Sequence, residues 1–164
     1  MKIKDERKLP VNNDVYQMGM LMSIGDTGEV LSINKGTYLV VEIGPISCYN
    51  LVNLKTGVTL FDTPATTLQE LTEKVSKLGN VTLESVTYSC GNLKTPSKYQ
   101  LYQVGNVIIN AGDLFFVIKQ GTHYSVVSLY GVCGGVLFNT LTDLADSVSE
   151  ESDKLVDVTA HLYN

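Results

Sequence analysis

The chain has 164 residues, 44% of them hydrophobic and 18% charged, with a formal net charge of −5. This balance excludes a disordered chain, and no apolar run is long enough to form a transmembrane helix. The acidic charge argues against binding to duplex nucleic acid or to an anionic membrane, and the polar start of the chain is unlike a secretory signal, so we expect a cytoplasmic protein.

The chain contains an internal repeat. TLQELTEKV at Thr67–Val75 returns as TLTDLADSV at Thr140–Val148, and the stretches before them match as well, GEVLSINKGTYLVV with GNVIINAGDLFFVI and YNLVNL with YSVVSL. The period of about 75 residues fits two small units in tandem better than a solenoid. We therefore expect a flexible N-terminal arm at 1–15, a first unit at 16–88, a linker at 89–98 and a second unit at 99–164.

In the first unit, the short apolar run Met18–Ile24 is followed by turn residues, which favours a strand over a helical turn. Val30–Ile33 and Tyr38–Ile43 are separated by Asn-Lys-Gly, which is typical of a hairpin. Tyr49–Leu54 then turns through Lys-Thr-Gly into Val58–Phe61. In the second unit, Val136–Phe138 matches this last strand, after the longer turn YGVCGG at Tyr130–Gly135.

Thr67 and Thr140 are predicted to cap two short helices, because each has an acidic residue three positions later. In the first helix, Leu68, Leu71 and Val75 share one face, as expected of a helix that covers a sheet. Leu141, Leu144 and Val148 do the same in the second. Each unit therefore reads β-β-β-β-α-β.

This element order resembles that of an SH3-like barrel. The fragments GxYLVV, YNLVNLKTG and TLQEL also resemble small proteins that bacterial phages encode, many of them SH3-like. The resemblance implies a mainly β fold of two tandem SH3-like small barrels packed as a pseudo-twofold pair. It implies no catalytic residues, and it suggests a phage host-interference (anti-defence) protein that acts in the host cytoplasm.

Several strands are apolar on both faces, LFFVI at Leu114–Ile118 most clearly. A strand with one face in water alternates apolar and polar residues, so we expect the second face of these strands to be covered. The candidates are the other unit, a second chain or a ligand, and the other unit is the simplest. We expect Tyr49 and Tyr124 to lie at equivalent places near the seam, by which we mean the contact between the two units.

No catalytic or metal-binding motif is present. His123 and His161 have no ligand at helical spacing, and the three cysteines form no CxxC pair, so we expect free thiols and no metal or cofactor. A nucleophilic pair of Cys133 with His123 lacks any supporting motif. The chain is therefore predicted not to be an enzyme.

The nine tyrosines suit a binding protein, because tyrosine offers contact area at low entropic cost. A nucleotide-type ligand would stack on tyrosine and place its phosphate near lysine, which gives Tyr49, Lys55, Lys119 and Tyr124 as candidate ligand-binding residues. The alternatives are that these tyrosines belong to the core, that the protein blocks a host protein through its surface, or that it is a phage structural component. A homo-oligomer also stays open.

Overall fold

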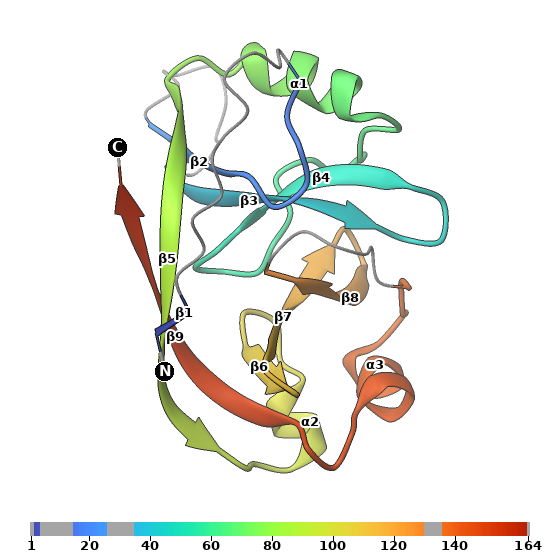
Figure 1. Ribbon diagram of the computed structural model, residues 1–164. Helices are drawn as coiled ribbons and strands as arrows, with labels where there is room; N and C mark the ends of the chain where they lie inside the picture. The colour runs from blue at the N-terminus through green and yellow to red at the C-terminus, as the bar shows by residue number, and fades with distance from the viewer. Residues whose placement is uncertain (1, 4–14, 26–34, 130–135, 164) are drawn as a thin grey trace.

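The computed structural model describes residues 2–3, 15–25, 35–129 and 136–163, and Figure 1 shows their arrangement. The elements of these residues are, in chain order, β1 (Lys2–Ile3), β2 (Leu21–Ile24), β3 (Gly36–Ile43), β4 (Cys48–Asn53), α1 (Leu68–Ser76), β5 (Val81–Lys94), α2 (Lys98–Leu101), β6 (Val107–Asn110), β7 (Asp113–Gln120), β8 (His123–Ser128), α3 (Leu141–Val148) and β9 (Lys154–Tyr163). The protein is therefore mainly β, as predicted.

The strand order repeats in mirror fashion. Neighbouring strands follow the order β4-β3-β2-β5-β9-β6-β7-β8, with every named pair antiparallel. We call β2–β5 with α1 the first half, and α2, β6–β9 and α3 the second half. In this order β2 corresponds to β6, β3 to β7, β4 to β8 and β5 to β9, with α1 and α3 at matching places. The topology thus repeats, as the internal repeat predicts.

The SH3-like arrangement of two barrels is not confirmed. Among the described strands, the pairing order is an open path that ends at β4 and β8, and two antiparallel groups share β5. The start of β5 pairs with β2 and its later part pairs with β9, so one long strand runs through both groups. A strand of 14 residues can do this because its two ends extend past different neighbours.

Each half-sheet is covered on both faces, as the two-sided apolar strands predict. On β3, Leu39, Val41 and Ile43 point into a central core shared by the two halves, and Tyr38 and Val40 point toward α1. The second half contributes Phe116, Ile118, Val127 and other residues to the same central core. The other unit is therefore what covers the second face, and α1 and α3 cover the outer faces.

The helix caps are confirmed. The Thr67 hydroxyl accepts a hydrogen bond from the Glu70 amide, and the Thr140 hydroxyl accepts one from the Asp143 amide, both at 3.0 Å. In the second helix, Leu144 and Ala145 are buried, whereas Val148 is 37% exposed. The helix-face prediction therefore fails at Val148, where the last turn of α3 leaves the sheet.

Three sequence-based assignments differ from the structure. Ser89–Lys94, expected in the linker, is the later part of β5, because β9 pairs with it across a bulge that takes up Gly91 and Asn92. In the arm, Lys2–Ile3 pairs with β5 as β1. Gln100–Val104, which we expected to occupy the same place in the second unit as the strand Met18–Ile24, begins inside the short helix α2.

The repeat alignment also shifts in detail. Val30–Ile33 lies outside the described residues, and β2 is the strand that pairs with β3, through Met22 opposite Tyr38. Phe138 was matched to Val58–Phe61, yet it takes the place of Ala65. Phe138 bridges Tyr124 and Ala65 bridges Tyr49, each two residues before a helix cap.

Candidate functional site

The seam is closely packed near the predicted binding residues. Asn50 is fully buried and donates to the Phe61 carbonyl and to the Gln120 side chain, each at 2.7 Å. The side-chain carbonyl oxygen of Asn50 accepts from the backbone amides of Leu51 and Phe61. A side chain bonded on every polar atom leaves no group to bind a ligand, so this contact holds the two halves together.

A short segment after β4 links the two halves through the backbone. The Lys119 amide donates to the Gly57 carbonyl, and the Thr59 amide donates to the Lys119 carbonyl. A Cβ atom on Gly57 would lie 2.6 Å from the Gly105 nitrogen, so the chain requires glycine at this contact.

The four predicted binding residues do not form one site. Tyr49 and Tyr124 occupy equivalent places, but both are half-buried on the outer faces, Tyr49 with the residues around α1 and Tyr124 with those around α3. The expected place at the seam is therefore wrong. The prediction fails because side chains alternate between the two faces of a strand. On β4, Asn50 and Val52 face the other half, so Tyr49 faces away from it. Lys119 lies opposite Tyr124, and Lys55 is exposed in the turn after β4.

A row of hydroxyl side chains crosses three strands of the first half. Ser23 on β2 lies directly opposite Thr37 on β3 and directly opposite Thr82 on β5. Directly opposed residues project from the same face of a sheet, so three hydroxyl groups stand side by side. Within the described part of the chain, none of these hydroxyls has a hydrogen-bond partner, and all three side chains are half-buried or exposed.

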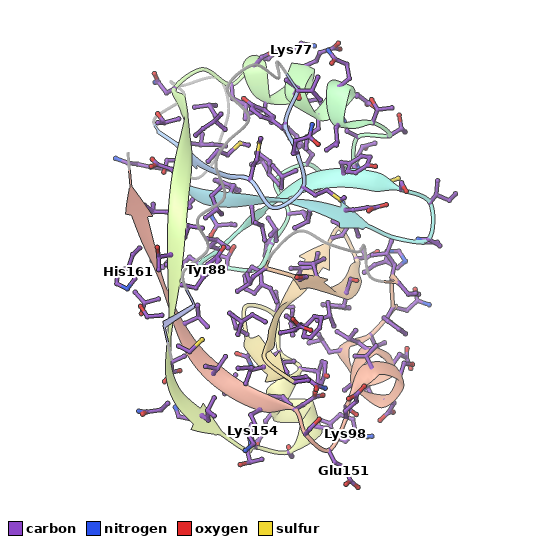
Figure 2. All side chains as sticks on the ribbon, viewed as in Figure 1. Lys77, Tyr88, Lys98, Glu151, Lys154 and His161 are labelled. Atoms are coloured by element: carbon purple, nitrogen blue, oxygen red, sulfur yellow. The ribbon has the colours of Figure 1, made fainter. Side chains whose placement is uncertain are left out.

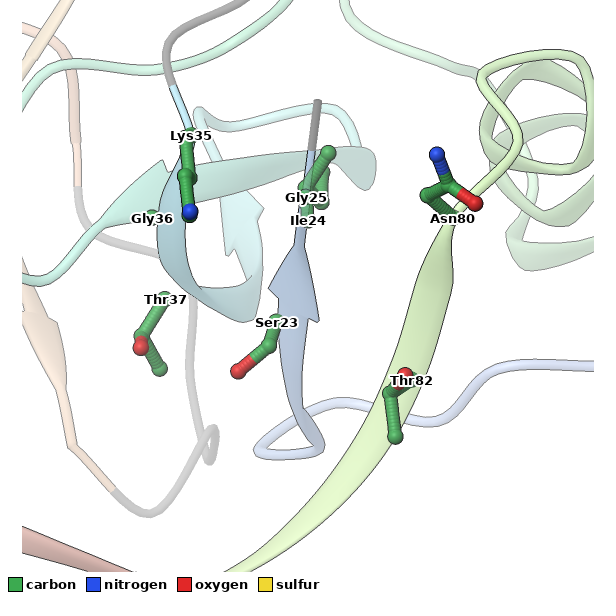
Figure 3. A pocket seen from close by; sticks show the side chains of 8 residues that line it. All are labelled: Ser23, Ile24, Gly25, Lys35, Gly36, Thr37, Asn80 and Thr82. Carbon is green, nitrogen blue, oxygen red and sulfur yellow. The ribbon is translucent and has the colours of Figure 1, made fainter. Parts of the chain in front are cut away.

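This hydroxyl row lies in a pocket of about 460 Å³ (Figure 3). Figure 3 shows Thr37, Ser23 and Thr82 along one side, with Lys35 and Asn80 toward the other. The Gly25 amide donates to the Asn80 carbonyl at 3.0 Å, which holds the end of β2 against the start of β5. The remaining lining residues are Ile24, Gly25 and Gly36.

A cation lies beside the hydroxyl row. Lys35 lines the same pocket and is exposed. A ligand in the pocket would therefore meet an ammonium group and three hydroxyl groups. Hydroxyl groups donate and accept, so they suit a ligand that carries hydroxyls of its own.

A second pocket, of about 290 Å³, lies between α2 and the loop after α3, near Lys98 and Glu151 in Figure 2. Its cation is already used, because Lys98 pairs with Asp146, and this hydrogen bond raises the pKa of Lys98. Its other charged lining residues are the carboxylates of Glu150, Glu151 and Asp153. This pocket therefore suits an anionic ligand less well than the hydroxyl row does.

The two histidines lie on different strands, His123 on β8 and His161 on β9. The His161 ring contacts the Ser89 hydroxyl on the outer surface, and His123 lies near Thr122. Cys48 and Cys90 are free and half-buried, and Cys133, with the turn Tyr130–Gly135, lies outside the described residues. Among described residues, no group of three or more His, Cys, Asp or Glu side chains is placed to hold a metal ion.

No protein-family model, curated protein or solved structure matches the chain. In the described part of the structure, no helix has the length and apolar character needed to cross a bilayer. The resemblance to phage-encoded SH3-like proteins therefore stays a prediction.

Sequence reasoning did not find the hydroxyl row. Its one local signal is Ser23, a polar residue inside the apolar run MGMLMSI. The repeat alignment concealed this signal, because it matched Val30–Ile33 of the first unit, and not β2, to the segment that forms β6.

Proposed function

We propose that this protein is a non-catalytic binding protein that sequesters a small phosphate-bearing ligand of the nucleotide type in the pocket of the hydroxyl row. The observation that carries the proposal is three aligned hydroxyl groups, without partners among the described residues, beside the ammonium group of Lys35. In this arrangement the ligand's phosphate faces Lys35, and its hydroxyl groups face the hydroxyl row.

The corresponding row in the second half supports this proposal. There Leu114 lies opposite Ile109, and Ile109 lies opposite Lys154. Leu114 is fully buried in the central core and Ile109 packs against it. The same fold therefore accepts apolar residues in this row, so packing alone does not require hydroxyl groups in the first half.

The host-interference role in a host cytoplasm and the SH3-like origin of each half belong to the same proposal. They rest on the resemblance of the fragments quoted above and on the repeated element order. A protein that only sequesters its ligand needs no catalytic group.

The test is a calorimetric titration with adenosine 5′-monophosphate, ribose 5-phosphate and inorganic phosphate. We expect binding of at least one of the first two, weakened about tenfold or more by Lys35→Gln, because a charge-assisted hydrogen bond contributes about 1.5–3 kcal/mol. Lys154→Gln is the matched control, since this exposed lysine lies in the corresponding row of the second half. No heat with any of the three probes, or equal loss in both variants, would contradict the proposal.

A second candidate is a protein that blocks a host protein through an apolar surface. Ile46, in the turn after β3, is 78% exposed, and Val136 is 60% exposed. The segments that carry these residues approach each other, because the Leu137 side chain lies 3.5 Å from the Cβ position of Gly44. Exposed apolar patches mark protein-binding sites, so Ile46→Ser would abolish capture of a host protein but leave the titrations unchanged.

A further inference from the structure

The outer edge of β9 has no partner strand within the described residues. β9 pairs with β5 along its length, but with β6 only through Lys154 and Leu155. From Val156 to Tyr163 the backbone groups of its other edge therefore pair with no described strand. Figure 1 shows this end of β9 beside β5, with no other labelled strand beyond it. Proteins usually shorten, charge or cover such an edge, because it pairs readily with another strand.

The edge is long and its side chains are accessible. Asp157, Thr159, Ala160, His161 and Leu162 are all exposed, and Leu162 is 39% exposed although it is large and apolar. Figure 2 shows His161 pointing away from the body of the molecule. No proline interrupts the stretch LVDVTAHL. In the described part of the chain, Asp157 supplies the one carboxylate along this edge.

We propose that β9 pairs antiparallel with β9 of a second copy of this chain, around a twofold axis at Thr159. This register places Asp157 opposite His161 of the other copy, and Thr159 opposite its own equivalent. On the other face it places Val156 opposite Leu162 and Val158 opposite Ala160. Every pair thus joins complementary or similar side chains, and such cross-strand pairs stabilise a sheet.

The self-complementary pattern is what selects a second copy as the occupant. A twofold axis perpendicular to the sheet keeps each side chain on its own face, so the apolar residues of both copies meet on one face and the polar residues on the other. Shifting the register by two residues, to an axis at Val158, would place Asp157 opposite Thr159 and lose the Asp157–His161 pair. This face of β5 and β9 also carries Lys94, whose ammonium group lies 4.0 Å from the Asp157 carboxylate of the same chain.

The test is sedimentation velocity of the full chain over a concentration series, with three variants. We expect a dimer for the parent and at least a tenfold weaker dimer for Thr159→Lys, which places two lysines opposite each other on the axis. Thr142→Lys, a matched exposed threonine on α3, should leave the dimer unchanged. Thr159→Cys should form an intermolecular disulfide under mild oxidation that the parent does not form, since facing Cβ atoms lie about 4.5–5.5 Å apart.

A monomeric parent would overturn the proposal and leave a strand of a different protein as the occupant of this edge. A dimer that Thr159→Lys does not weaken would overturn it as well, because the contact would then lie elsewhere. Circular dichroism of Thr159→Lys establishes that the variant is folded. If Thr159→Lys is not folded, the Thr159→Cys variant tests the pairing instead, and absence of the intermolecular disulfide would overturn it.

Discussion

The two halves of the molecule use the same row of strand positions in different ways. In the first half, Thr37, Ser23 and Thr82 form a polar row that lines a pocket, and in the second half Leu114 and Ile109 extend the central core. At the next position along β2 and β6, whose side chains project from the opposite face of the sheet, the polarity is reversed. Ile24 of the first half is buried and apolar, whereas Asn110 of the second half bonds to the buried carboxylate of Asp153.

This difference separates what the fold needs from what it tolerates. Both halves keep the threonine caps, the strand order, and the tyrosine that bridges the residue two positions before each cap. The side chains of the rows follow no common pattern. The polar row of the second half is bonded internally, whereas the hydroxyl row of the first half is open to solvent. We infer that the first half carries the binding site.

Exchanging residues between the rows should give the largest effect. Leu114→Thr places a hydroxyl in the central core and removes buried methyl groups, so we expect a loss of about 2–4 kcal/mol in the free energy of unfolding. Thr37→Leu, the reverse exchange, should cost less than about 1 kcal/mol, because the pocket has room for the side chain. Urea denaturation of both variants measures the difference. Equal losses would show that the two rows are packed alike.

The polar row of the second half should resist removal of its carboxylate. Asp153, which is 5% exposed, accepts from the Tyr102 hydroxyl at 2.6 Å, from Asn110 and from the Glu150 amide. Asp153→Ala leaves these donors buried without an acceptor, which costs about 1–3 kcal/mol. Glu151→Ala is the control, since this neighbour is exposed and should change stability by less than about 0.5 kcal/mol. A control as damaging as Asp153→Ala would refute the account of this network.

The same network should make stability depend on alkaline pH. Burial, together with the hydrogen bond to Asp153, raises the pKa of Tyr102 above its ordinary value of about 10. Above that pH the unfolded chain loses the Tyr102 proton while the folded chain keeps it, so stability falls as pH rises. We expect Tyr102→Phe to flatten the fall between pH 9 and pH 11 in thermal unfolding. An identical slope in both proteins would contradict this role of Tyr102.

The helix caps should give the smallest effects, and nearly equal ones. Thr67→Ala and Thr140→Ala each remove one side-chain hydrogen bond to a backbone amide, which costs about 1 kcal/mol. The two losses should agree within a few tenths of a kcal/mol, because the Glu70 side chain accepts from the Thr66 amide and adds no second bond to Thr67. Guanidinium denaturation tests the pair, and a loss at one site only would show that the two helices are not equivalent.

Local signals predicted the elements, but not their partners. The caps at Thr67 and Thr140 could be recognised because a cap depends on residues three positions apart. That both faces of these strands are covered followed from the apolar residues on both faces of Leu114–Ile118. By contrast, the strand state of Ser89–Lys94 depends on β9, about 65 residues away in sequence. The hydroxyl row depends on the register of three strands, which periodicity does not fix when a stretch as long as 25–35 separates β2 from β3 in the sequence.

Native mass spectrometry of the parent chain and of Ser23→Ile, after incubation with adenosine 5′-monophosphate and ribose 5-phosphate, tests the central claim most directly. The variant copies the row residue of the second half into the first. If only the first half carries the site, the parent gains one ligand per chain and the variant gains none. Two ligands per chain, equal binding by both proteins, or no binding by the parent would contradict the account.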